Sequence, residues 1–178
     1  MYGPFICYRG STRLDWVSEL WKQGEAAILH AGNLEHLSRI EIEGEPVPEI
    51  ITCENESPFN FMRREPDLPP LVYTAGFPNS TVRRFLALLP KQTKIRHWGD
   101  TDPEGLAIAA IINRIRPVEL FRCGIAECEK LSGSLIPLDK RKRKRGEVML
   151  RDSKFPFRRE LEFSLNYGWL EQESWTPF

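Results

Sequence analysis

The chain has 178 residues, 41% of them hydrophobic and 28% charged, which is typical of a globular domain with its own core. Lys and Arg residues balance Asp and Glu residues, so any affinity for nucleic acid has to come from local clusters of charge. No apolar run reaches the roughly 18 residues of a membrane span. Four cysteines (Cys7, Cys53, Cys123 and Cys128) form no C-x-x-C pair, which predicts reduced thiols, no zinc site and a cytoplasmic location.

Residues 1–47 carry the weakest pattern. Trp16, Leu20 and Trp21, followed by the apolar residues 26–29, suggest helical material. We therefore interpret residues 1–47 as an N-terminal segment or the remnant of an upstream domain, and residues 48–178 as the principal domain. The abrupt start favours a truncated chain or a domain that normally follows another.

From Pro48 onward, strand-like runs alternate with helical patterns. Apolar residues at helical spacing follow Asn79 and Pro103, and a further amphipathic helix is expected before Gly168. The expected strands span residues 49–53, 71–75, 95–99 and 118–123. This alternation predicts an α/β fold: a Rossmann-like, mostly parallel four-stranded sheet with helices on both faces, a less regular N-terminal segment and a C-terminal helix.

Acidic residues follow two of these strands. Glu54 comes after the first, and Asp100 and Asp102 come after the third. Because ligands in open α/β sheets bind beyond the carboxyl ends of the strands, we expect the three carboxylates to converge. The string D-x-D-P-x-G is equally an ordinary strand–turn–helix joint, with Asp102 as the cap and Pro103 in the first turn.

Three convergent carboxylates suit a divalent cation. Mg²⁺, for which Mn²⁺ can substitute, prefers hard oxygen ligands, and bound metal ions support phosphodiester hydrolysis. In this interpretation Glu54 and Asp100 hold one ion, and Asp102 holds a second or orients its waters. Without a cation, at least one of these carboxyl groups should have a raised pKa.

Other acidic residues and one histidine are weaker candidates. Glu56 is expected either to contact the residues that bind the metal, without binding the metal itself, or to face solvent. Glu171 and Glu173 would add a ligand only if the last segment folds back over the sheet edge, and a solvated pair is favoured. His97 is interpreted as a buried, hydrogen-bonded side chain rather than a general base.

An uninterrupted basic run follows the predicted sheet. It comprises Lys140, Arg141, Lys142, Arg143, Lys144 and Arg145. Such a run can bind the phosphates of DNA with salt-dependent affinity. The alternative is a solvated loop without a ligand. Beside a candidate nuclease site, contact with the DNA backbone is the favoured interpretation.

Several motifs resemble a known domain. Glu54 followed by D-x-D-P-x-G at residues 100–105 resembles the Toprim domain of topoisomerases, primases and several nucleases, most of all the topoisomerase VI A-subunit branch. E-N-E-x-x-F from Glu54, Y-x-x-G-F from Tyr73, H-W-G-D-x-D from His97 and the terminal L-E-Q-E are similar to the carboxy-terminal domain of the JetD family, the nuclease subunits of bacterial Wadjet plasmid-defence systems.

The resemblance implies a Mg²⁺-dependent DNA endonuclease domain. It assigns catalysis and metal binding to Glu54, Asp100 and Asp102, and implies DNA as substrate, SMC-like complex subunits as partners, and compatibility with a homodimer. Family members normally carry amino-terminal DNA-binding parts that this chain lacks, so the isolated chain can be inactive. None of its four tyrosines lies in the context of the DNA-cleaving tyrosine of topoisomerase VI relatives.

Two other functions remain open. One is a non-catalytic metal- and DNA-binding Toprim module of a topoisomerase VI-like protein. The other is a haloacid-dehalogenase-like phosphatase with Asp100 as nucleophile and Asp102 as acid. The phosphatase is disfavoured because its D-x-D follows the first strand of its domain, whereas two expected strands precede Asp100 here.

Overall fold

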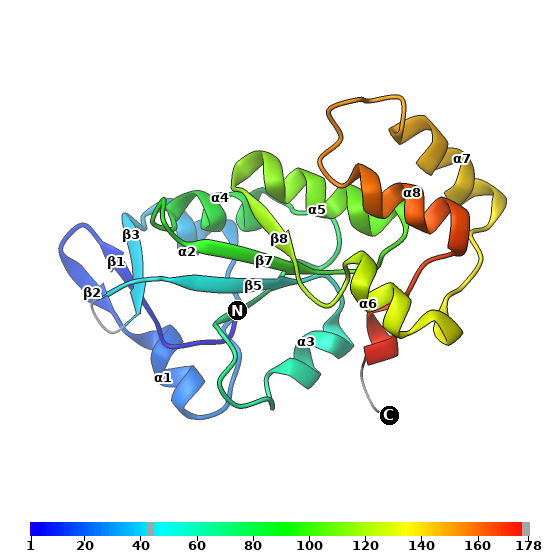
Figure 1. Ribbon diagram of the computed structural model, residues 1–178. Coiled ribbons are helices and arrows are strands. Elements are labelled where there is room, and N and C mark those ends of the chain that lie inside the picture. The colour runs from blue at the N-terminus through cyan, green and yellow to red at the C-terminus, as the bar shows by residue number, and fades with distance from the viewer. Residues whose placement is uncertain (43–44, 176–178) are drawn as a thin grey trace.

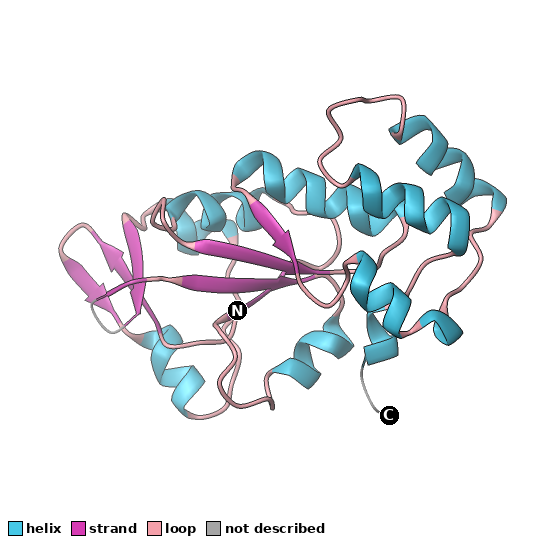
Figure 2. Ribbon diagram, in the orientation of Figure 1, coloured by secondary structure: helices cyan, strands magenta, loops and turns pink. Residues whose placement is uncertain are grey.

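The computed structural model of the protein describes residues 1–42 and 45–175, so the last three residues of the predicted principal domain lie outside it. It contains a parallel sheet and an antiparallel sheet (Figures 1 and 2). The parallel sheet has the order β6-β5-β7-β8. Its strands are β5 (Glu49–Cys53), β6 (Leu71–Tyr73), β7 (Lys94–Trp98) and β8 (Val118–Leu120). The predicted four-stranded parallel sheet is confirmed.

Burial explains why β5 forms the middle of this sheet. Ile50, Ile51 and Cys53 are completely buried, because neighbouring strands pair with both edges of β5 and helices cover both faces. A strand of this kind consists of consecutive β-branched and apolar residues without alternation. Figure 1 shows α4 (Ser80–Leu88) and α5 (Pro103–Ile115) along one side of the sheet and α3 (Glu56–Met62) along the other.

The ends of the predicted helices have clear physical causes. The Asn79 side chain accepts a hydrogen bond from the N–H of Val82 at 3.0 Å and caps α4. Helix α8 (Arg158–Tyr167) ends at Gly168, whose φ of 105° suits a residue without a Cβ atom. The remaining helices are α1 (Trp16–Lys22), α2 (Ala31–Glu35), α6 (Ile125–Lys130), α7 (Lys140–Met149), η1 (Ser132–Ser134) and η2 (Gln172–Trp175).

The N-terminal part is more regular than the sequence predicted. It forms an antiparallel sheet of order β2-β1-β3-β4. The strands are β1 (Phe5–Arg9), β2 (Thr12–Leu14), β3 (Arg39–Ile42) and β4 (Glu45–Pro46). Phe5 and Ile40 of this sheet pack in the same hydrophobic core as Ile50 and Phe85, so the two sheets share one interior. The domain boundary near residue 47 stays a prediction.

None of the helices within the described residues is long and apolar enough to cross a membrane.

Candidate active site

The two acidic strand ends lie side by side. Strands β5 and β7 run parallel, and their last paired residues are Cys53 and Trp98. Glu54 follows directly, and its N–H donates to the carbonyl of Trp98 at 3.0 Å. The N–H of Asp100 in turn donates to Oε2 of Glu54 at 3.4 Å. The predicted meeting of Glu54 and Asp100 at one edge of the sheet is therefore present.

Two glycines make this arrangement possible. A Cβ atom on Gly99 would lie 2.5 Å from Oε2 of Glu54 and 2.8 Å from Nε2 of His97, so any other residue here would displace this carboxylate or the His97 ring. A Cβ atom on Gly105 would lie 2.1 Å from the carbonyl oxygen of Asp100, because the first turn of α5 packs directly on that backbone. The spacing of both glycines around Asp100 is thus a steric requirement of the site.

Burial and mutual repulsion disfavour charge on two of the carboxyl groups. Burial, followed by the charge of Asp100, raises the pKa of Glu54 to about 8. Burial, together with the charges of Asp102 and Glu173, raises the pKa of Asp100 to about 6, against a hydrogen bond from Gln172 and the charge of Lys142. Both shifts have the direction expected where carboxyl groups meet, and a divalent cation would relieve both effects.

Asp102 has a different environment. Its Oδ1 accepts a hydrogen bond from the N–H of Gly105 at 2.8 Å and caps α5. Its Oδ2 lies 2.5 Å from Nζ of Lys142, and the Asp102 side chain is only 4% exposed. The ordinary capping role and an ion pair therefore occupy both carboxylate oxygens.

The donor set fits a hard cation at two of the three predicted residues. Across residues 1–42 and 45–175, no three His, Cys, Asp or Glu side chains are arranged to hold a metal ion together. The carboxyl groups of Glu54 and Asp100 are still close enough for the charge of Asp100 to raise the pKa of Glu54, and Mg²⁺, which keeps several waters, can be bound by one or two carboxylates. Metal binding by Glu54, Asp100 and Asp102 stays a prediction.

The C-terminal segment folds back over this edge of the sheet, where Figure 1 shows it next to α3. The N–H of Thr101 donates to the carbonyl of Leu170 at 3.1 Å, and the N–H of Leu170 donates to Oγ1 of Thr101 at 2.7 Å. These two bonds fix the segment beside Asp100 and place Gln172 inside the site.

Gln172 is a site residue that the sequence did not reveal. It is 1% exposed, and its N–H donates to Oδ1 of Asp100 at 2.7 Å. Its side-chain Oε1 accepts from the N–H of Asn55 at 3.0 Å, and its Nε2 donates to the carbonyl of Trp98 at 3.1 Å. Gln172 therefore links the ends of β5 and β7 and orients the Asp100 carboxylate.

The three weaker acidic candidates, Glu56, Glu171 and Glu173, differ in exposure and contacts. Glu173 is half-buried, accepts a hydrogen bond from Nδ2 of Asn55 at 3.4 Å and helps to raise the pKa of Glu54, so the solvated pair predicted for the C-terminus is wrong for this residue. Glu171 is exposed, as expected. Glu56 is exposed and begins α3, since the chain turns into a helix after Asn55 rather than continuing as a strand.

His97 is structural, as the sequence suggested. It is 1% exposed, and its Nδ1 lies 2.9 Å from Oγ1 of Thr52 on the neighbouring strand. Burial lowers the pKa of His97 to about 4, so the ring is neutral at physiological pH.

The basic run forms the first part of α7 rather than a solvated loop. Asp139 caps this helix by accepting a hydrogen bond from the N–H of Lys142 at 2.7 Å. Lys142 pairs with Asp102, and Nε of Arg145 lies 3.6 Å from Oε1 of Glu104 in the first turn of α5. The other four basic residues of the run are all exposed; they are Lys140, Arg141, Arg143 and Lys144.

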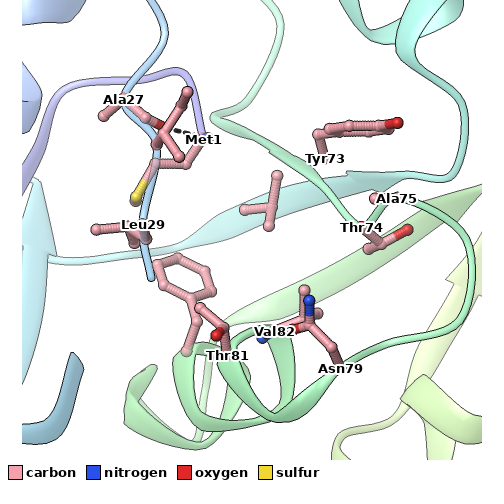
Figure 3. Close-up of a pocket in the computed structure, with 12 residues that line it drawn as sticks. Met1, Ala27, Leu29, Tyr73, Thr74, Ala75, Asn79, Thr81 and Val82 are labelled. Atoms are coloured by element: carbon pink, nitrogen blue, oxygen red, sulfur yellow. Dashed lines mark hydrogen bonds between the residues drawn. The ribbon is translucent and has the colours of Figure 1, made fainter. Parts of the chain in front are cut away.

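A cavity of about 250 Å³ lies apart from these charged groups (Figure 3). It opens beside the carboxyl end of β6 and is lined by Tyr73, Thr74 and Ala75, by the start of α4 and by Met1, Ala27 and Leu29. None of the three predicted acidic residues lines it. The candidate chemistry therefore belongs to the sheet edge and not to this cavity.

Comparison with protein families assigns the chain to one family. Residues 31–148 match the family described as "Protein of unknown function C-terminus (DUF2399)". The chain belongs to this DUF2399 family. The match includes Glu54, Asp100, Asp102 and the basic run, whereas Gln172 lies beyond it. Among curated proteins, none matches the chain.

The raised pKa of Glu54 predicts that Glu54→Gln stabilises the metal-free DUF2399 chain at neutral and basic pH. The pKa rises from the ordinary value of 4.5 to about 8 on folding, so between these values the folded state binds more protons than the unfolded state. Stability is therefore lost as the pH rises through this window, and a neutral Gln avoids the loss. The midpoint of thermal unfolding of the variant should exceed that of the wild type by on the order of 5 °C at pH 8.

The difference between the two unfolding curves should vanish below pH 4.5, where the glutamate is protonated in both states. The matched control is Glu171→Gln, which changes an exposed carboxylate of the same edge and should show no such pH dependence. A Glu54→Gln variant less stable than the wild type at pH 8 would contradict the account.

Proposed function

We propose that this DUF2399 chain is a Mg²⁺-dependent DNA endonuclease domain of the Toprim type, as in the JetD subunit of a Wadjet-type anti-plasmid defence system. The observation that carries the proposal is the hydrogen bond from the N–H of Asp100 to the Glu54 carboxylate at the carboxyl edge of a parallel sheet, with a cationic helix tied to the same edge. The family match supports it, because DUF2399 is the family of the JetD carboxy-terminal domain. The assignment as Toprim rests on the motifs around Glu54 and Asp100.

The residues of the edge have distinct roles in this proposal. Glu54 and Asp100 would hold the ion, and the N–H of Gln172 keeps Oδ1 of Asp100 in place. When bound, Mg²⁺ supplies charge stabilisation for the scissile phosphate and an activated water. Neutral His97 is enclosed and bonded to Thr52, so it supports the strand end rather than taking a proton from water.

Helix α7 supplies the surface for the DNA backbone. Six cations in the first two turns of a helix are unfavourable for its stability, because the helix dipole already makes this end positive. The same arrangement is favourable for binding anions. Lys142 and Arg145 tie the helix to the acidic edge, and the other four cations of the run remain for phosphates.

One observation favours the alternative of a non-catalytic metal- and DNA-binding module. Asp102 is engaged by Lys142 and Gly105, so two carboxylates rather than three remain for a cation. The same contacts count against a haloacid-dehalogenase-like phosphatase, because the acid of that mechanism must be able to give up a proton to the leaving group. In this chain Asp102 is a buried, ion-paired helix cap.

The proposal extends to the surroundings of the protein. DNA is the proposed substrate, SMC-like subunits are the proposed partners, and the domain is compatible with a homodimer. Cys7, Cys53, Cys123 and Cys128 are all buried free thiols, which fits the proposed cytoplasmic location.

The proposal predicts metal-dependent nicking of supercoiled plasmid DNA that depends on both adjoining carboxylates. Asp100→Asn and Glu54→Gln should each lower the nicking rate by more than about 100-fold. Replacing residues that only hydrogen-bond to metal ligands already lowers metal affinity or activity by roughly 10- to 100-fold. Glu171→Gln is the control and should retain the wild-type rate. The assay uses the chain both alone and together with its partner subunits. Binding of metal and DNA without cleavage in either case would favour the non-catalytic module.

Salt dependence tests the role of α7. Replacing four exposed cations of α7 (Lys140, Arg141, Arg143 and Lys144) by Gln should weaken binding to duplex DNA. It should also flatten the plot of log affinity against log salt concentration by about 0.9 for each DNA phosphate that the helix no longer neutralises. The control is Lys91→Gln, which removes an exposed charge before the opposite end of β7. An unchanged slope in a variant with wild-type helix content would exclude α7 from the DNA interface.

A further inference from the structure

We propose that Lys142 is a positioning residue whose ammonium group takes the place of a second divalent cation at Asp102, leaving a site for a single ion at Glu54 and Asp100. This inference rests on the proposed function, because it concerns the metal stoichiometry of the same site. It assigns Asp102 to the scaffold and only the other two carboxylates to the ion.

The contacts of Lys142 define a closed environment for one positive charge. Its Nζ lies 2.5 Å from Oδ2 of Asp102 and 3.6 Å from the centroid of the Trp169 ring, over which it forms a cation–π contact. The side chains of Lys142 and Asp102 are 20% and 4% exposed. Replacing only one member of so shielded an ion pair is costly, because the charge of the other member would stay buried without a partner.

The fold brings Lys142 to this position through a glycine. Lys142 and Gly146 are four residues apart and so share one face of α7. A Cβ atom on Gly146 would lie 3.0 Å from Cδ2 of Leu165 and 3.2 Å from Cγ of Pro103. The absence of that atom lets α7 approach both α8 and the first turn of α5, where Asp102 is the cap.

The charges then match one divalent ion. Lys142 cancels the charge of Asp102, whereas no Lys or Arg side chain pairs with Glu54 or Asp100 within the described residues. The carboxylates of Glu54 and Asp100 remain as candidate ligands, and their two charges equal the charge of one Mg²⁺. The charge of Glu173 also acts on both groups. Glu173, half-buried at the rim, accepts a hydrogen bond from Asn55. A second ion at Asp102 would have to displace the ammonium group of Lys142 and the hydrogen bond from Gly105.

The test is to count Mn²⁺ ions bound by the whole chain, without DNA, using the electron paramagnetic resonance signal of free Mn²⁺. The wild type should bind one ion. Asp102→Asn should still bind one, with an affinity within about threefold of the wild type, and Asp100→Asn should lose at least about tenfold in affinity. Lys142→Met should bind a second ion, and the added change Asp102→Asn should remove it.

Two further variants separate the role of Lys142 from general charge and folding effects. Lys142→Arg keeps a cation at Asp102 and should bind one ion. Lys144→Met removes an equal charge from the exposed side of the same helix and should also bind one ion. A second ion in Lys144→Met would mean that net charge, and not the position of Lys142, sets the stoichiometry, and would overturn the inference.

A measurement without metal tests the ion pair itself. In denaturant unfolding, Lys142→Met and Asp102→Asn should each destabilise the chain, and the double variant should lose clearly less than the sum of the two, because it leaves no unpaired charge. Additive effects would overturn the inference. If Mn²⁺ binds but Asp102→Asn abolishes binding as Asp100→Asn does, only the inference fails. If the wild type binds no Mn²⁺, the proposed metal-dependent function fails with it.

Discussion

The parallel pairing of β5 with β7 is the constraint on which the candidate site depends. Parallel strands end at the same edge, so the residues after Cys53 and Trp98 must share one small volume. The glycine at position 99 and the tight start of α5 then decide how closely the Glu54 carboxylate and the Asp100 backbone can approach. The hydrogen bonds of Gln172 and Asp102 at this edge hold the two strand ends in that arrangement.

The protein accommodates its acidic groups in two different ways. It neutralises Asp102 internally, with Lys142 and the N–H of Gly105 in α5. It leaves Glu54 buried and Asp100 half-buried, with their pKa values raised to about 8 and 6, which lowers the stability of the fold at neutral pH. Perturbed carboxyl groups gathered at the end of a parallel sheet are the kind of group that functional sites contain. Because Lys142 pairs with Asp102 and not with Asp100, the same D-x-D motif can provide both a helix cap and a candidate ligand.

Local sequence patterns were sufficient for the parallel sheet but not for the parts that close the site. Strand β5 and helices α4 and α5 follow from consecutive apolar residues, helical spacing and the caps Asn79 and Asp102. Strand β1 was missed although its burial resembles that of β5, because the strands that pair with it are short: β2 has three residues and β3 has four. Helix α7 was missed because six like charges oppose a helix, and distant contacts of Lys142 and Gly146 hold it in place. Gln172 was missed because its hydrogen-bond partners lie 72 to 119 residues away in the sequence.

The central claim is that Glu54 and Asp100 form the cation-binding pair while Lys142 stays on Asp102. A crystal structure of the protein soaked in Mn²⁺ tests it most directly, through anomalous scattering from the ion. We expect one peak in contact with the carboxylates of Glu54 and Asp100, and an intact contact between Lys142 and Asp102. A peak coordinated by Asp102 with Lys142 displaced, or no peak at this edge of the sheet, would contradict the account.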